Sequence, residues 1–387
     1  MSERLRVGID ARVLAESAPM GVARYLTGLL RAVAEVAPQY EYLLYLCGRP
    51  LSHGPLTIKP FQQRVLTGNA VLNSPWVWQQ CYLPWHVWWD RVDVLFAPYY
   101  CGPLFTSVPQ VVCLHDISFA LFPQDFPSWI HFKPKLLARP TSRAAARVVT
   151  VSEFSRQEII RTYGLAPDKV VVVPPGSASS LRQCLSAAEG TLLVPGETPF
   201  FLFVGSLLPR RQVDLVIRAL AQLPPDYHLV VVGESNPAKQ VSLKRIAQQY
   251  EVADRVQCLG HVSDPVLDDL YRRAVALVLP STYEGFGLPV LEAMTHGLPV
   301  VAWDIPVMRE VAGDAAVLVQ SGDVAGLTQA LLQLGIDRTR RQALGEAGKQ
   351  RATQFSWQRS AAILLAVLQE VTGTPPACAS EEESFQG

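Results

Sequence analysis

Two glutamates flank a glycine-rich turn in the second half of the chain. Glu284 and Glu292 lie eight positions apart in the segment Glu-Gly-Phe-Gly-Leu-Pro-Val-Leu-Glu. A short apolar run precedes the turn, and a helical pattern with Pro289 in its first turn follows. Backbone N–H groups and the positive end of a helix favour phosphate at such a place. An anion site between two carboxylates predicts a ligand with both phosphate and hydroxyl groups, such as a sugar nucleotide.

The elements around this turn predict a βαβ unit. Residues 274–279 are typical of a buried parallel strand, Gly297 predicts the end of the helix, and residues 299–302 predict the next strand. Open α/β sheets bind ligands at the carboxyl ends of their strands. The turn therefore lies where such a protein places its ligand.

A second candidate anion site is the segment Gly-Ser206-Leu-Leu-Pro-Arg210-Arg211, which also follows a strand and precedes a helix. Two guanidinium groups there suit a diphosphate, because each can bind phosphate oxygens in bidentate fashion. A solvated basic loop is the alternative. The chain has no Asp-x-Asp triplet and we predict no metal site, so neutralising a leaving diphosphate would fall to Arg210, Arg211 and the amides of residues 285–287.

Composition limits the possible partners. The chain has 387 residues, 49% hydrophobic, with 34 basic and 34 acidic residues, so nucleic acid is disfavoured as the main partner, with a local basic patch as the open alternative. The seven cysteines are scattered, which indicates reduced thiols and a cytoplasmic protein. We expect neither a signal peptide nor a membrane-spanning helix, because no apolar run reaches about 18 residues.

The alternation of strands and helices runs twice along the chain. It predicts an α/β fold of two doubly wound Rossmann-like domains that face each other across a cleft. The first domain covers residues 1–176, a linker covers 177–198, the second domain covers 199–354, and residues 373–387 form a disordered tail. The predicted strands are residues 6–10, 42–47, 92–97, 110–114, 147–151, 169–173, 200–204, 227–232, 255–259, 274–279, 299–302 and 316–319.

The first domain offers weaker candidates. His115 ends a strand at the predicted cleft edge, where it would hydrogen-bond a sugar hydroxyl or a reacting group; a structural histidine is the alternative. Gly21 lies in a loop that would bring backbone close to a phosphate or acceptor, or that is a plain turn before the helix predicted from residue 22. Ser152 is the expected N-cap of another helix. A dense cluster of tryptophans consists of Trp76, Trp78, Trp85, Trp88 and Trp89. We expect these side chains to pack in the core, and the alternatives are stacking on a sugar acceptor or insertion into a lipid interface.

The segment from Glu284 to Met294 resembles the glutamate-x7-glutamate motif of the retaining glycosyltransferases called group 1, or family 4, which have the GT-B fold. The resemblance extends over nearly the whole chain, from residues 8–12 to residues 355–357. Individually weaker matches occur in the right order at residues 21–25, 115–116, 151–155, 270–274 and 309–316.

The resemblance implies a role for each matching residue. Glu284 would contact the donor sugar, Glu292 would hold the ribose hydroxyls, and His115 would lie near the transferred sugar. Gly21 would lie near the diphosphate, and residues 355–372 would form a helix that crosses back to the first domain. Amides for the sugar and phosphate would come from Gly285, Phe286, Gly287 and Leu288. Many members have Arg at the position of Ser206 and Lys at that of Arg211, and Ser206 follows a branch that resembles bacterial O-antigen mannosyltransferases.

These observations predict a metal-independent retaining glycosyltransferase of polysaccharide biosynthesis. It would use no cofactor and would move a hexose, with mannose favoured, from a GDP- or UDP-linked donor to a glycan or lipid-linked acceptor. Peripheral contact with the inner membrane face stays open. The alternatives are a sugar-nucleotide epimerase on the same fold and a catalytically silent nucleotide-binding subunit. A nicotinamide-dependent dehydrogenase is disfavoured, because no G-x-G-x-x-G follows the first strand of either domain.

Overall fold

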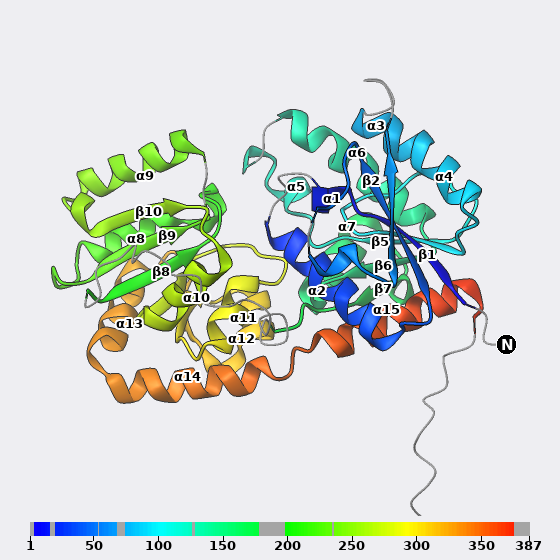
Figure 1. The fold of residues 1–387 in the computed structure, drawn as a ribbon. Coiled ribbons are helices and arrows are strands. Elements are labelled where there is room, and N and C mark those ends of the chain that lie inside the picture. Colours follow the sequence, from blue (N-terminus) through cyan, green and yellow to red (C-terminus); the bar gives the residue numbers. More distant parts are fainter. Residues whose placement is uncertain are drawn as a thin grey trace, which may run out of the picture.

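The chain folds around two parallel sheets (Figure 1). The computed structural model describes residues 4–15, 20–52, 54–67, 74–125, 128–177, 198–233 and 236–374. The first sheet has seven strands in the order β3-β2-β1-β4-β5-β6-β7, and the second has six in the order β10-β9-β8-β11-β12-β13. This architecture confirms the predicted fold class of two doubly wound α/β units.

Buried apolar runs form most strands of the first sheet. Its strands are β1 (Arg6–Asp10), β2 (Glu41–Cys47), β3 (Phe61–Leu66), β4 (Val94–Ala97), β5 (Gln110–Cys113), β6 (Arg147–Thr150) and β7 (Val170–Val172). The prediction missed β3, which lies at the sheet edge and pairs with β2. Only Phe61 and Leu66 of β3 are buried, so the strand lacks the continuous apolar pattern of its neighbours.

Helices and short turns surround this first sheet. Ser152 caps α7 as predicted, because its Oγ accepts a hydrogen bond of 3.0 Å from the N–H of Ser155. The elements are α1 (Arg12–Ala15), α2 (Met20–Val36), η1 (Pro55–Thr57), α3 (Pro75–Val77), the π-helical turn η2 (Trp78–Tyr82), α4 (Leu83–Trp89), α5 (Ser118–Leu121), η3 (Pro123–Asp125), α6 (Ser128–Ala144), α7 (Glu153–Tyr163) and η4 (Pro167–Lys169).

The second sheet is equally apolar at its centre. Strands β8, β11 and β12 are buried along their whole length, as expected for a sheet covered on both faces. The strands are β8 (Phe200–Val204), β9 (His228–Val232), β10 (Val256–Gly260), β11 (Ala276–Leu279), β12 (Val300–Trp303) and β13 (Val317–Val319). The helical elements are η6 (Pro209–Arg211), α8 (Val213–Leu220), α9 (Pro237–Gln249), η7 (Ala253–Arg255), α10 (Asp264–Arg273), α11 (Leu288–Thr295), α12 (Pro306–Ala312), η8 (Gly313–Ala315), α13 (Val324–Ile336) and α14 (Arg338–Ala352).

The last helix, α15 (Trp357–Thr372), leaves the second domain and packs on α2 of the first (Figure 1). Two glycines make room for the start of this helix. A Cβ on Gly28 would lie 2.5 Å from Trp357 Cζ2, and one on Gly176 would lie 2.3 Å from the Trp357 nitrogen. The helix therefore ties the two domains together. Most of the predicted linker, residues 178–197, and residues 375–387 of the predicted tail lie outside the described residues.

The tryptophan cluster at residues 76–89 does not pack in the core as we expected. Only Trp78 is buried, so core packing is wrong for the other members of the cluster. The period of α4 explains this result, because Leu83 and Val87 are one turn apart and occupy its inner face. The exposed fractions are 44%, 56%, 56% and 66% for Trp76, Trp85, Trp88 and Trp89. In the part of the chain that the structure describes, no helix is both long and apolar enough to span a bilayer.

Candidate functional site

The glycine-rich turn connects β11 to α11 and presents the start of that helix. Gly287 is the N-cap of α11 and has a φ of 92°, a left-handed conformation that favours glycine. Pro289 lies in the first turn of the helix, as predicted. The ring of Phe286 is buried and packs edge-on against Phe355, with 5.4 Å between ring centroids. The N–H groups of Val290 and Leu291 bond to the carbonyl of Gly287, and Pro289 has no N–H. The N–H of Leu288 is therefore the one in this first turn that is left for an anion.

Glu284 and Arg211 meet beside this turn. Glu284 is only 9% exposed, and its Oε1 accepts a 2.9 Å hydrogen bond from Ser281 Oγ. Arg211 Nε lies 3.2 Å from the same oxygen, which makes an ion pair. The guanidinium of Arg211 crosses the backbone at Gly205, where a Cβ would fall 1.6 Å from Arg211 Nη1. The two predicted anion loops, including Ser206 beside Gly205, thus form one site in the second domain.

Glu292 lies one turn into α11 and is held from two sides. Arg24 Nη1 donates a 2.7 Å hydrogen bond to its Oε1, and the hydroxyl of Tyr271 donates a 2.8 Å bond to its Oε2. Arg24 comes from α2 of the first domain and also pairs with Asp264. Burial by itself lowers the pKa of Arg24, but the carboxylates of Glu292 and Asp264 outweigh it and raise the pKa. Glu292 therefore lies at the contact between the domains.

His115 follows β5 and is buried on the first-domain side. Its Nε2 lies 2.9 Å from the carbonyl oxygen of Pro98, and because a carbonyl only accepts, Nε2 carries the proton. Nδ1 is then the acceptor nitrogen of the ring. Burial lowers the pKa of His115, and neither this hydrogen bond nor the charge of Asp116 fully offsets that effect. The imidazole is thus neutral near pH 7 and able to accept a proton or a hydroxyl hydrogen bond.

The first domain touches the turn directly at two glycines. A Cβ on Gly285 would lie 2.6 Å from the carbonyl oxygen of His115, and one on Gly21 would lie 3.7 Å from Leu288 Cδ1. The carbonyl of Gly285 accepts hydrogen bonds of 2.6 Å and 3.0 Å from the hydroxyls of Ser152 and Ser155. The start of α2 and the start of α11 therefore lie next to each other, and both helix ends favour an anion there.

Two family descriptions match the chain in succession. Residues 19–177 match Glycosyltransferase Family 4, and residues 188–351 match Glycosyl transferases group 1. The chain is 32% identical over 258 residues to O-antigen chain mannosyltransferase B of Escherichia coli, which covers 64% of this chain and 67% of that protein. The chain belongs to the group 1 glycosyltransferases. It is also 31% identical to the D-inositol 3-phosphate glycosyltransferase of Xylanimonas cellulosilytica, over 70% of this chain and 68% of that protein.

Solved structures give this glycosyltransferase the same fold. Sucrose-phosphate synthase of Thermosynechococcus elongatus superposes with a TM-score of 0.72 at 18% identity, over 96% of this chain and 100% of that chain. Anabaena HepE in complex with UDP and glucose superposes with a TM-score of 0.71 at 21% identity, over 95% of this chain and 100% of that chain. Both likenesses support the GT-B architecture predicted for this chain.

The structure separates the two neighbouring arginines of this glycosyltransferase. Arg211 faces Glu284, whereas Arg210 Nη1 donates a 2.7 Å hydrogen bond to Asp125 Oδ2 of the first domain. The side chains of Arg210 and Asp125 are 8% and 0% exposed, so this ion pair is buried between the domains. The carbonyl of Arg210 accepts bonds of 2.8 Å and 3.1 Å from the N–H and the hydroxyl of Thr282. Arg210 thereby connects both anion loops to the first domain.

Sequence reasoning missed several residues that complete the site. Glu310 reaches from α12 to the first domain, where its carboxylate accepts hydrogen bonds of 2.7 Å and 2.9 Å from the N–H groups of Glu153 and Phe154 at the start of α7. The matches at residues 21–25, 270–274 and 309–316 contain three of the missed residues, but no spacing assigns them a partner. The missed residues are Arg24, Asp125, Tyr271, Ser281 and Glu310.

Proposed function

We propose that this group 1 glycosyltransferase moves a hexose from a nucleotide diphosphate sugar to a hydroxyl of a glycan or lipid-linked acceptor, with retention at the anomeric carbon. The observation that carries the proposal is the meeting of Glu284, Arg211 and the start of α11 opposite the first domain. A carboxylate for sugar hydroxyls and a cation with a helix end for phosphate match the two halves of such a donor.

The donor would lie along the turn. The diphosphate takes Arg211 and the amides of Gly287 and Leu288, with the start of α2 at Gly21 on its other side. The ribose hydroxyls take Glu292, whose carboxylate is held by Arg24 and Tyr271 in the described structure. A bound ribose would share or displace the Arg24 bond, which couples nucleotide binding to the contact between the domains.

The chemistry that we propose needs stabilisation of the leaving group above all. As the bond between the anomeric carbon and the phosphate oxygen breaks, negative charge develops on the diphosphate and Arg211 with the helix end stabilises it. The acceptor oxygen attacks from the same face and its proton passes to the departing phosphate, which releases the nucleoside diphosphate. The sequence offers no clear nucleophile for a covalent intermediate. Domain closure at Gly285 would exclude water and limit donor hydrolysis.

His115 is proposed to position the sugar. Its protonated Nε2 is committed to Pro98, so its Nδ1 would accept from a sugar hydroxyl. Arg210 is proposed to hold the closed arrangement through Asp125 while Arg211 meets the diphosphate.

Two relatives named as mannosyltransferases support mannose as the transferred sugar in this proposal. Besides the Escherichia coli protein, O-antigen chain mannosyltransferase RfbU of Salmonella typhimurium is 31% identical over 215 residues, covering 55% of this chain and 57% of that protein. Structural neighbours named as complexes with UDP or UDP-glucose support a nucleotide-linked donor. Turnover with GDP-linked and UDP-linked hexoses decides which nucleotide the donor carries.

One assay tests the proposal. Release of nucleoside diphosphate is measured from GDP- and UDP-linked hexoses with the wild type, Glu284→Ala and Glu284→Gln. We expect turnover with one donor class and a loss of roughly 100-fold or more in Glu284→Ala. Glu346→Ala is the matched control, because Glu346 lies on α14 with a side chain 64% exposed. Equal turnover in wild type and Glu284→Ala would remove Glu284 from the mechanism, and isomerisation of the donor without transfer would establish an epimerase instead.

A further inference from the structure

Three tryptophans project from one face of α4 into solvent. Trp85, Trp88 and Trp89 are 56%, 56% and 66% exposed. Their ring centroids lie 5.5 Å apart for Trp85 and Trp88, 6.5 Å for Trp85 and Trp89, and 6.4 Å for Trp88 and Trp89. Scattered exposed apolar residues are ordinary on a soluble domain, but a contiguous aromatic group of this size marks an interaction surface.

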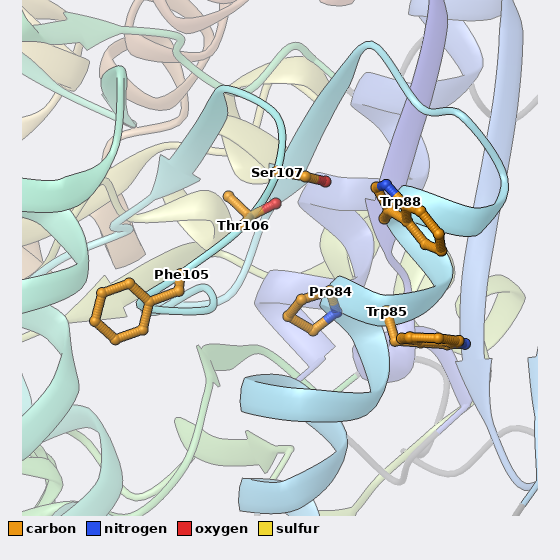
Figure 2. Close-up of a pocket in the computed structure, with 6 residues that line it drawn as sticks. All are labelled: Pro84, Trp85, Trp88, Phe105, Thr106 and Ser107. Atoms are coloured by element: carbon orange, nitrogen blue, oxygen red, sulfur yellow. The ribbon is translucent and has the colours of Figure 1, made fainter.

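A loop beside α4 enlarges this surface. Phe105, which precedes β5, is 84% exposed. Figure 2 shows Pro84, Trp85 and Trp88 on α4 and Phe105 with two hydroxyl residues on the loop, around a hollow of about 380 Å³. The hydroxyls of Thr106 and Ser107 are the polar groups of that lining. We call Trp85, Trp88, Trp89 and Phe105 the aromatic patch.

The aromatic patch lies on two stretches of sequence without charged side chains, which residues 90–93 separate. Residues 74–89 and 94–115 contain no Asp, Glu, Lys or Arg. Between residues 42 and 115 the charged residues are Arg49, Lys59, Arg64 and Arg91 against Asp90 and Asp93.

Both of these acids already have partners. Asp90 accepts a 3.0 Å hydrogen bond from the hydroxyl of Tyr45 and lies 3.5 Å from Arg64 Nη2, and Asp93 accepts from the N–H of Arg6 at 2.7 Å. Arg91 is exposed and lies two residues after the end of α4. Arg91 is thus a positive charge beside α4 that suits an anionic surface, while Asp90 is offset by Arg64 and the exposed Asp93 lies two residues further along.

We propose that the aromatic patch docks this protein on an anionic lipid bilayer. Tryptophan is enriched at bilayer interfaces because its ring is apolar while its N–H remains hydrogen-bonded. The patch would enter the headgroup region with Arg91 near lipid phosphates. In Figure 1, α4 lies on the side of the first domain away from the second, so docking leaves the contacts around Gly285 undisturbed.

The shape of the patch favours a bilayer over a sugar or a protein. A sugar site needs several convergent polar groups around a stacked ring, whereas the hollow offers two hydroxyls. A protein partner would normally be met by a wider rim of mixed charges than residues 90–93, between the two uncharged stretches, provide. A bilayer requires neither, since apolar area and a few cations suffice for peripheral binding.

Vesicle flotation of the full chain tests this proposal. The lipids are phosphatidylcholine alone or an equimolar mixture with phosphatidylglycerol. We expect the wild type to bind the anionic vesicles and the triple variant Trp85→Ser, Trp88→Ser, Trp89→Ser to lose about tenfold or more in affinity. The matched control removes three exposed apolar side chains of the second domain and should bind like wild type; it carries Val241→Ser, Tyr250→Ser and Ile336→Ser.

A charge variant and a fluorescence measurement sharpen the test. Arg91→Gln should lose about fivefold on anionic vesicles and nothing on phosphatidylcholine. Brominated lipids should quench tryptophan fluorescence in the wild type and much less in the triple variant. Wild type that fails to float, or a triple variant that floats equally well, overturns the proposal. Self-association of the lipid-free wild type that the triple variant loses would also overturn it and would assign the patch to a second copy of the chain.

Nucleotide release keeps this result separate from the proposed function. The triple variant should release nucleoside diphosphate from a soluble donor at the wild-type rate, which shows that it is folded. If the wild type releases none, the glycosyl transfer fails while the flotation result still decides the docking surface.

Discussion

The second domain builds its half of the site mainly on two loops that each lead from a strand into a helix, residues 205–211 and 281–292, whereas the first domain assembles its half from more scattered elements. Residues 281–292 supply the turn, both glutamates and the start of α11. The first-domain residues come from α2, the end of β5, η3 and the start of α7, and they are Gly21, Arg24, His115, Asp125, Ser152 and Ser155.

This difference follows from what each half must do. An anion-binding helix end is a local structure, because its N–H groups and its glycines belong to one turn. Closing over a sugar requires groups from many strand ends, which only the sheet brings together. The second domain should therefore govern phosphate chemistry, and the first should govern closure and sugar position.

The largest effect should separate the neighbouring arginines. Arg211→Ala removes the cation beside Glu284, so the rate of nucleotide release should fall about 100-fold, with partial recovery in Arg211→Lys. Arg210→Ala acts through closure and should cost less. The measurement is steady-state turnover with a saturating donor.

A double-mutant cycle controls this assignment. If Arg210 works through its ion pair, Asp125→Ala should reproduce the loss in Arg210→Ala and the double variant should add little. The thermal stability of each variant is measured alongside turnover, because either single substitution leaves a buried charge without its partner and should destabilise the protein. Equal losses in Arg210→Ala and Arg211→Ala, with Asp125→Ala silent, would contradict the division between the two halves.

A substitution at Gly285, where the two domains meet, should have a smaller effect on turnover. Gly285 does not have a positive φ, so alanine is tolerated by its backbone. Its added Cβ would nevertheless lie 2.6 Å from the carbonyl oxygen of His115, so the domains must separate slightly. We expect Gly285→Ala to lower turnover about tenfold and to raise the radius of gyration in X-ray scattering.

Gly21→Ala is the control for shape in that experiment. Its Cβ would lie at an ordinary contact distance of 3.7 Å from Leu288 Cδ1, so the radius of gyration should not change. An unchanged radius and rate in Gly285→Ala would show that closure at this glycine does not limit the reaction.

The smallest effect should be the pH dependence of His115. Its pKa in the folded protein is lowered from the ordinary 6.5, so the unfolded chain takes up the proton first as the pH falls. The stability linked to this group is fully present above about pH 6.5 and declines below it. Thermal melts between pH 7 and pH 5 should show wild type losing stability relative to His115→Asn, and parallel curves would argue against a buried neutral imidazole.

Much of the architecture could be predicted from the chain alone. Strands with continuous apolar runs were found to within a few residues, but β3 was missed because an edge strand buries only its two ends. The tryptophans of α4 were assigned to the core by default, and helical period placed Leu83 and Val87 there instead. A sequence pattern therefore predicts which apolar segments are buried better than it predicts which apolar residues are exposed, because the surfaces of proteins also contain many apolar residues.

The sequence by itself determined the glycine-rich turn and its two glutamates, because the conformations and amides that suit an anion are set within one short segment. Only the tertiary structure decided which side chains face them. It placed Arg211 on Glu284 and sent its neighbour Arg210 to Asp125, and it brought Arg24 to Glu292. The pairings of Arg210 and Arg24 depend on how the two domains pack, and that of Arg211 depends on how the second sheet brings two loops together. No spacing along the chain records the distance between residues so far apart in sequence.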